Sequence, residues 1–279
     1  MVLNCKGRLL DIESPIVMGI LNVTPDSFYD GGKSAKMEDA LCQAEQMVEE
    51  GARIIDVGGM SSRPGAKIID EEEELSRVVP VILELHRKYP DLIISVDTVN
   101  ANVADRACKA GASVVNDISA ASIDNKIIDV AANHRVPYIL MHMKGKPENM
   151  QEKPSYTDVV KEILDFLAVK IRDLRQRGVH DIIIDPGFGF GKSLEHNYTL
   201  LKKLSVFRIF DMPLMVGISR KSMVYNLLGS SPELALNGTT ACHMLALING
   251  ARILRVHDVK EAMETISIYN EVRRKTVTD

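Results

Sequence analysis

The chain has 279 residues, a formal net charge of −4 at pH 7 and an apolar fraction of 46%, which suit one large globular domain or two ordinary ones. The slight negative charge, without any long run of Lys or Arg, excludes the basic surface expected of a nucleic-acid-binding protein. No apolar segment is long enough to span a membrane, and charges precede the first apolar run, so we expect neither a membrane partner nor a secretory signal.

The four cysteines stand at positions 5, 42, 108 and 242, without paired spacing. This pattern is typical of inert thiols in a reducing compartment and not of a disulfide framework or a zinc site. We therefore expect a cytoplasmic protein.

Short runs rich in Ile, Val and Leu recur along the chain, and longer amphipathic segments lie between them. Near-continuous apolar runs are typical of parallel strands buried on both faces. The runs are residues 16–22, 53–59, 92–98, 113–119, 138–143, 181–187, 214–219 and 252–258. The clearest helical segments are 37–52, 71–89 and 155–178, and helix-stopping glycines stand at Gly51, Gly111, Gly178 and Gly250.

Eight strands that alternate with helices predict an α/β fold, a single (β/α)8 TIM barrel domain over residues 1–279. Residues 1–15 form a short N-terminal extension, which we expect to be a hairpin that plugs or flanks the bottom of the barrel. The alternative is a doubly wound open sheet. That fold usually carries a glycine fingerprint after its first strand, and the sequence NVTPDSF is not one.

A polar or charged side chain follows nearly every run: Asn22, Asp56, Asp97, Asn116, His142, Asp185, Ser219 with Lys221, and Arg255 with His257. Any one of them can be a helix cap or turn residue. Together they predict a polar ligand site at the carboxyl ends of the strands. Carboxylates and amides there suit a flat nitrogen heterocycle with N–H donors, whereas Arg63, Arg220, Lys221, Arg255 and His257 predict an anion-binding rim.

The stretch DPGFGFGKS, residues 185–193, resembles a phosphate-binding loop only superficially. Gly187 and Gly191 enclose three residues where that motif needs four, and Pro186 stands where its first glycine belongs. So many glycines favour a loop that bends closely over a ligand. Lys192 and Ser193 then read as an ordinary helix start.

Other features have structural interpretations. His142, within the sequence MHM, is expected to be a buried core histidine and not a site residue. Glu71 to Glu74 predict the acidic first turn of a helix, not a metal site. The segment TTACHMLALING is apolar on more than one side, so it is either a helix packed on both faces or part of a twofold interface; we expect a homodimer.

Eight motifs together identify a resemblance over about residues 16 to 258. They are MGILNVTPDSFYDGG, DVGGMSSRPGA, SVDT, VNDIS, MHMKGKPENMQ, DPGFGFGKSLEHN, GISRKS and RILRVHDV. In order and spacing they resemble the bacterial dihydropteroate synthases. That family condenses (7,8-dihydropterin-6-yl)methyl diphosphate with 4-aminobenzoate to 7,8-dihydropteroate and diphosphate, the step of folate synthesis that sulfonamides block.

The resemblance implies roles for individual residues. Asp185 and Asn116 would bind the amino-pyrimidine edge of the pterin, with Asp97 beside its other ring. Lys221 would reach the carbonyl and ring nitrogen, and Arg255 would pack on the ring face. Asn22 would help hold a Mg²⁺ cofactor on the diphosphate. The anion region would contain Ser62, Arg63 and His257, and the aminobenzoate slot Phe190, Pro64 and Ser219.

The resemblance also implies a catalytic set, which is Asp97, Lys221, Arg63 and His257. We favour a dissociative course, in which diphosphate leaves first and Asp97 stabilises the cationic pterin methylene before the amine attacks. A concerted displacement is the alternative. Two residues depart from the usual pattern, because Met60 stands where Glu is more frequent and Ser62 where Thr is common.

Three rival functions remain open at this point. A pterin-binding methyltransferase domain shares the barrel but needs no diphosphate pocket, and the SSRP, SRKS and RVHDV segments argue against it. A catalytically silent homologue is disfavoured because none of the expected chemical groups is missing. A Schiff-base aldolase using Lys221 is disfavoured because Arg220 beside it suggests anion binding.

Overall fold

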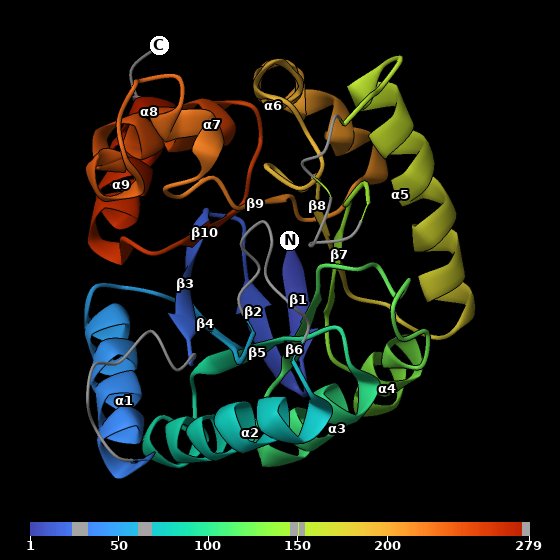
Figure 1. Cartoon of the computed structure of the whole chain (residues 1–279), viewed down its shortest axis with the longest axis vertical. Helices are drawn as coiled ribbons and strands as arrows, with labels where there is room; N and C mark the ends of the chain where they lie inside the picture. Colours follow the sequence, from blue (N-terminus) through green and yellow to red (C-terminus); the bar gives the residue numbers. More distant parts are fainter. Residues whose placement is uncertain (24–32, 61–68, 146–149, 151–153, 275–279) are drawn as a thin grey trace.

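The structure is a computed structural model of the chain, and it describes residues 1–23, 33–60, 69–145, 150 and 154–274. Figure 1 shows strands at the centre, surrounded by a ring of helices. This is the arrangement expected of parallel strands that are buried on both faces.

All eight predicted strands are confirmed within the described residues, and they form one parallel sheet in the order β8-β7-β6-β5-β4-β3-β10-β9. The main-chain N–H of Ile184 donates to the carbonyl of Pro213 at 2.9 Å, and a parallel bridge joins Ile184 to Leu214. These contacts bring the two ends of the sheet together, so the barrel closes and the open-sheet alternative is wrong. The strands are β3 (Ile16–Asn22), β4 (Ile54–Gly58), β5 (Ile93–Asp97), β6 (Val114–Asp117), β7 (Tyr138–Met141), β8 (Ile182–Asp185), β9 (Met215–Val216) and β10 (Ile253–Val256).

Helices follow the strands around the outside of the barrel. Side chains of Asp70, Asn100 and Asp158 accept hydrogen bonds from the first turns of α2, α3 and α5, which explains where these helices begin. Gly111 ends α3 with φ of +128°, a backbone conformation that favours glycine. The elements are α1 (Lys33–Glu49), α2 (Glu71–Lys88), α3 (Ala101–Ala110), α4 (Ile127–His134), α5 (Val159–Gln176), α6 (Leu194–Lys202), η2 (Leu204–Phe210), α7 (Ser222–Tyr225), η3 (Pro232–Leu234), α8 (Leu236–Ile248) and α9 (Val259–Arg273).

The amino-terminal hairpin closes the bottom of the barrel. Strands β1 (Val2–Cys5) and β2 (Arg8–Asp11) pair antiparallel. Their buried side chains join one apolar cluster with residues from the first halves of the barrel strands, so the expected plug is confirmed. The cluster contains Leu3, Cys5, Leu10, Ile12, Ile16, Met18, Ile54, Ile93, Val114, Ile139, Ile183, Met215 and Ile253.

A larger core lies between the barrel and its helices, and it includes residues of every barrel strand. Two of the helices, α8 and α9, pack against each other, and α9 also covers β3. None of the helices in the described ranges is long and apolar enough to cross a membrane.

Candidate active site

Three of four neighbouring strands, β3, β5 and β6, carry a polar residue at the same level of the barrel, near their carboxyl ends. Register pairs Asn22 of β3 with Gly58 of β4, Gly58 with Asp97 of β5, and Asp97 with Asn116 of β6. The sequence therefore positioned Asn22, Asp97 and Asn116 correctly relative to one another.

Arg255 of β10 connects this row across the barrel. Its Nε donates to Asp56 Oδ2 at 2.7 Å, and its Nη2 donates to Asp97 Oδ2 at 2.7 Å. Asn116 Nδ2 donates to the same oxygen of Asp56 at 2.9 Å. The guanidinium of Arg255 thus binds two carboxylates. One of these, Asp56, also orients the side-chain amide of Asn116.

Asp56, one of the strand-end carboxylates, belongs to this group, although the sequence did not predict a ligand-binding role for it. It is fully buried, and its Oδ1 has no hydrogen-bond partner among the described residues. A buried acceptor without a partner is costly in a native protein and calls for a ligand or water. The signal that could have found it was its position in β4, two residues before the strand ends.

Burial raises the pKa of Asp97 to about 7. The positive charge of Arg255 opposes this rise, whereas the carboxylates of Asp56 and Glu74 add to it. Glu74, in the acidic first turn of α2, is itself buried, with Oε1 unpartnered in the described chain and a pKa raised mainly by burial. Two buried carboxyl groups with raised pKa values in one region are typical of a functional site.

Asp185 and Lys221 form a second group of charged residues, beside the network of Asp56, Asp97, Asn116 and Arg255. Asp185 Oδ1 accepts a hydrogen bond from the N–H of Gly187 at 2.7 Å, and burial raises the pKa of this carboxyl. Lys221 Nζ donates to the carbonyl of Phe188 at 2.6 Å and lies 4.4 Å from the ring centroid of Phe190.

Lys221 also interacts electrostatically with Asp97 and Arg255. Burial lowers the pKa of Lys221 to about 8, and the charges of Asp185 and Asp97 oppose that effect. Arg255 lies close enough to influence both Lys221 and Asp185. The structure therefore brings Asp97, Asn116, Asp185, Lys221 and Arg255 together at one end of the barrel, as predicted.

The predicted anion rim is only partly described. Ser219 Oγ accepts the main-chain N–H of His257 at 3.2 Å, so these two residues are neighbours, and His257 is exposed. Ser62, Arg63 and Pro64 lie outside the described residues.

Arg220 corrects one part of that prediction. Its Nε and Nη2 donate to the two carboxylate oxygens of Asp258 at 2.9 and 2.8 Å, and its Nη1 donates to the carbonyls of Pro232 and Glu233. The bidentate pair uses the face of the guanidinium that would otherwise bind an anion. Arg220 therefore fixes the connection between η3 and α9 and is not part of an anion rim.

Phe190 lies in a small apolar cluster beside the polar row. Its buried partners are Val99, Ile118, Met141 and Met150, and Met60 and Met143 pack against them. Met60, the residue that departs from the usual pattern, thus contributes apolar contact at the edge of the site.

Lys192 was interpreted wrongly as an ordinary helix-start residue. Ser193 does begin α6, since its side chain accepts from the N–H of His196 and His196 Nδ1 accepts from the N–H of Ser193. Lys192, however, is only 2% exposed, and its Nζ donates to backbone carbonyls. His142 is buried, as expected, and its ring packs edge-on to Phe166.

The surroundings of Asn22 fit a role in holding Mg²⁺. A side chain at Gly58 would stand 3.8 Å from Asn22 Oδ1 and 3.7 Å from Asp97 Oδ2, so glycine leaves space between these oxygens. No cluster of three or more His, Cys, Asp or Glu in the described residues is arranged to bind a metal. Mg²⁺ commonly takes one or two protein oxygens and completes its shell with substrate phosphates and water, which matches this donor set.

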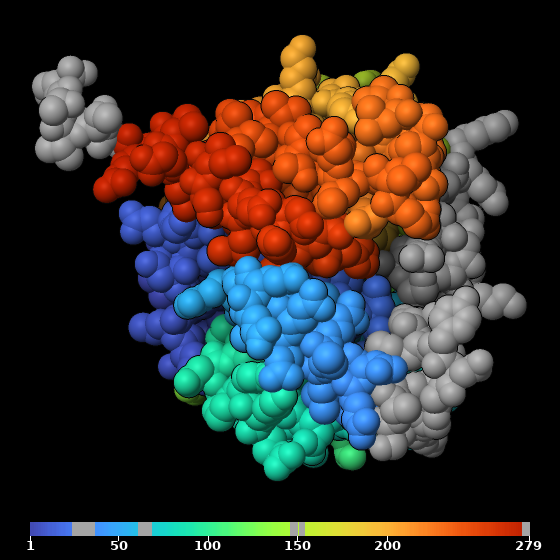
Figure 2. Space-filling view, turned by 90° about the vertical axis from the view of Figure 1, so that its left-hand side faces the viewer, coloured from blue at the N-terminus to red at the C-terminus, as the bar shows by residue number. Residues whose placement is uncertain are grey.

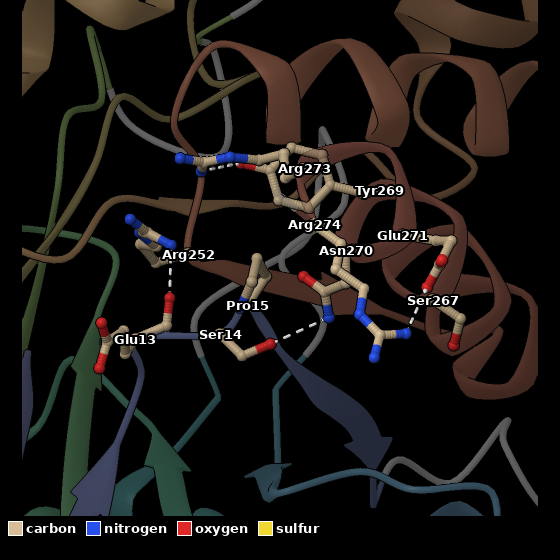
Figure 3. Close-up of a pocket in the computed structure, with 10 residues that line it drawn as sticks. All are labelled: Glu13, Ser14, Pro15, Arg252, Ser267, Tyr269, Asn270, Glu271, Arg273 and Arg274. Atoms are coloured by element: carbon tan, nitrogen blue, oxygen red, sulfur yellow. Dashed lines mark hydrogen bonds and ion pairs between the residues drawn. The ribbon is translucent and has the colours of Figure 1, made fainter. Parts of the chain in front are cut away.

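A shallow groove at the opposite end of the barrel is a poor alternative site (Figure 3). It lies beside Glu13 to Pro15, before β3, and Arg252, before β10. Arg252 Nη1 donates to the carbonyl of Glu13, and Arg273 Nη1 donates to Tyr269 Oη at 2.7 Å. These guanidinium groups are engaged within the protein, and barrel enzymes place their chemistry at the carboxyl ends of the strands.

Comparison with known proteins shows the family of the chain. The family model of the pterin-binding enzymes matches residues 18–257. The dihydropteroate synthase of Escherichia coli K12 is 46% identical over 270 residues, which cover 96% of this chain and 95% of that protein.

Two solved structures have the same fold over nearly their whole length. The Yersinia pestis dihydropteroate synthase in a sulfonamide drug complex is 45% identical, with a TM-score of 0.92, and the match covers 98% of this chain and 99% of that one. The Xanthomonas albilineans enzyme in complex with 7,8-dihydropteroate is 39% identical, with a TM-score of 0.89, and the match covers 99% and 100%.

Proposed function

The chain belongs to the family of pterin-binding enzymes, and we propose that it condenses (7,8-dihydropterin-6-yl)methyl diphosphate with 4-aminobenzoate, as a dihydropteroate synthase does. It is a transferase of folate biosynthesis, and its products are 7,8-dihydropteroate and diphosphate. The observation that carries this conclusion is the group of buried acceptors and cations at the carboxyl ends of the strands.

The pterin occupies the buried part of the site. Asp185 and Asn116 accept and donate hydrogen bonds at its amino-pyrimidine edge, and Asp97 lies beside the second ring. Lys221 donates to the carbonyl and ring nitrogen, and the guanidinium of Arg255 packs on the ring face. Support comes from the burial of Asp185 and Asn116, because a dry site strengthens such polar contacts.

Aminobenzoate and diphosphate occupy the outer part. Phe190, Ser219 and Pro64 border the aminobenzoate, and Ser62, Arg63 and His257 contact the diphosphate. The exposure of His257 and its contact with Ser219 support this division. The assignments of Ser62, Arg63 and Pro64 rest on the sequence resemblance alone. Asn22 would hold a Mg²⁺ ion that supplies positive charge to the departing diphosphate.

The reaction breaks the bond between the pterin methylene carbon and the diphosphate oxygen, whose electron pair leaves with diphosphate. Arg63 and His257 stabilise the charge that grows on this group. The carboxylate of Asp97 stabilises the cationic pterin methylene, and Lys221 keeps the ring in place. The amine of 4-aminobenzoate then forms the new C–N bond and releases one proton to solvent.

We also propose a cytoplasmic homodimer. All four cysteines are free thiols, as expected in a reducing compartment. Exposed apolar side chains lie on α8, on η3 and on the segment that follows α7, parts of the chain that lie next to one another (orange in Figure 2), and we propose that a second copy of this chain covers them. They are Leu227, Leu228, Leu234, Leu245 and Ile248.

The test is an assay for diphosphate release with the pterin diphosphate as substrate. Release that depends on both 4-aminobenzoate and Mg²⁺, with 7,8-dihydropteroate as the second product, is the expected result. Asp185→Ala and Lys221→Ala should each abolish pterin binding in calorimetry, and Arg63→Ala should chiefly weaken turnover. A sulfonamide should compete with 4-aminobenzoate. Release of diphosphate without any requirement for the amine would contradict the proposal.

A further inference from the structure

Lys192 is a buried cation beside the site that the proposed reaction does not use. Its Nζ lies 2.7 Å from the carbonyl oxygen of Gly187, 3.1 Å from that of Phe190 and 3.3 Å from that of His142. It also lies 3.1 Å from Nδ1 of His142. Four acceptors from two separate loops therefore converge on one ammonium group.

The chemistry of these groups explains why a lysine stands here. An ammonium group has three N–H donors and no acceptor, so it can satisfy several inward-pointing carbonyls at once. Burial lowers the pKa of His142 to about 3, so its ring is neutral and Nδ1 can accept. Burial also lowers the pKa of Lys192, to about 7, while the carboxylate of Asp185 favours the charged form.

The two loops joined by Lys192 are packed backbone against backbone. A Cβ atom at Gly187 would lie 2.0 Å from the carbonyl oxygen of His142, and one at Gly191 would lie 2.1 Å from that of Lys144. Carbonyl oxygens brought so close to a second main chain cannot all bind water. The ammonium of Lys192 supplies the donors that this arrangement otherwise lacks.

We infer that Lys192 is a positioning residue for the substrate site, which holds the loop from Gly187 to Gly191 in the geometry that presents Asp185 and Phe190. Its bond to the carbonyl of Gly187 fixes the residue whose N–H orients Asp185 Oδ1. Its bond to the carbonyl of Phe190 fixes the ring that lies over Lys221 Nζ. Lys221 holds the same loop through the carbonyl of Phe188, so two lysines fix three of its carbonyls.

This inference rests on the proposed function and predicts a loss of substrate affinity rather than a loss of folded enzyme. Lys192→Met removes every donor, and Lys192→Gln keeps two. The matched control is Ser193→Ala, which removes the cap of α6 at the next residue and leaves the lysine in place. Calorimetry with the pterin diphosphate, steady-state kinetics and thermal unfolding are measured for each variant.

Lys192→Met should raise the dissociation constant of the pterin diphosphate about tenfold or more, because buried carbonyls lose their donors and the loop shifts. The KM for 4-aminobenzoate should rise as well, and Lys192→Gln should lie between Met and wild type. Ser193→Ala should lower the melting temperature without changing either constant. If Lys192→Met does not fold, Lys192→Gln decides.

Wild-type affinity in Lys192→Gln or Lys192→Met would overturn the inference. A loss of affinity in Ser193→Ala as large as that in Lys192→Met, with equal melting temperatures for the two variants, would also overturn it. These results are distinct from a failure of the proposed function, which would appear as a wild-type protein that releases no diphosphate.

Discussion

Arg255 and Asp97 are joined by a 2.7 Å hydrogen bond between Nη2 and Oδ2, although 158 residues separate them in the chain. The same guanidinium binds Asp56. Removal of the Arg255 side chain would therefore leave two buried carboxylates, Asp56 and Asp97, without a counter-charge. This relationship makes Arg255 a structural element of the barrel as well as a proposed contact of the pterin.

Arg255→Met should therefore lower the free energy of unfolding by about 3–5 kcal/mol at pH 7, since breaking a buried ion pair leaves an uncompensated charge. Urea unfolding monitored by circular dichroism measures the loss. The control is Arg252→Met, which precedes the same strand at the other end and should cost about 0.5 kcal/mol or less. Equal losses in the two variants would contradict the assigned role of the Asp56–Arg255–Asp97 network.

The raised pKa of Asp97 predicts a pH-dependent stability. The folded protein keeps a proton on this carboxyl up to about pH 7, whereas the unfolded chain releases it near pH 4. The stabilising contribution of Asp97 is therefore present below pH 4 and is lost as pH rises to about 7. Asp97→Asn should gain stability relative to wild type over this window, as measured by urea unfolding of the substrate-free protein at pH 5 and pH 7.5. A constant difference between the two proteins would show that Asp97 titrates normally.

Two lysines beside the site, the buried Lys192 and the half-buried Lys221, predict a loss of pterin affinity at alkaline pH. Burial lowers the pKa of Lys192 to about 7 and that of Lys221 to about 8, so both ammonium groups lose protons in this range. The dissociation constant of the pterin diphosphate should rise as pH increases from 7 to 9, in calorimetric titrations at constant ionic strength. In Lys192→Met only the change near pH 8, due to Lys221, should remain. A flat profile in wild type would mean that neither lysine contributes its charge to binding.

The hairpin plug predicts a change in stability without a change in catalysis. Leu10 is 3% exposed within the bottom cluster, whereas Leu9 is 75% exposed on the same strand. Leu10→Ala should lower the free energy of unfolding by about 3 kcal/mol, and Leu9→Ala should change it little. Both variants should keep the wild-type kcat, because the site lies at the other end of the barrel. A reduced kcat in folded Leu10→Ala would show that the plug affects the site.

The sequence was sufficient to predict the barrel because its strands are continuous apolar runs. Ile16–Asn22 was predicted with its exact ends, while β9 contains only Met215 and Val216 of the predicted 214–219. The row of polar residues Asn22, Asp97 and Asn116 was also predictable, since parallel strands bring their carboxyl ends together.

The pairing of buried charges was not predictable from the sequence. Asp56 and Arg255 are 199 residues apart, and only closure of the barrel makes them partners. Arg220 resembles an anion-binding residue in sequence, but Asp258 occupies its guanidinium. Lys192 stands directly before a helix cap, and a helix-start pattern is the same whether such a lysine is exposed or buried among carbonyls.

The hairpin plug closes the base of the barrel, so in the proposed reaction the substrates and the product use the opening at the other end. In that reaction the pterin, which we propose binds beside the buried side chains of Asp185 and Asn116, enters before 4-aminobenzoate. In the proposed arrangement the aminobenzoate end of the product lies nearest that opening, and the product leaves in that direction. Because the product and the next pterin would use the same opening, the product has to leave before the next pterin binds.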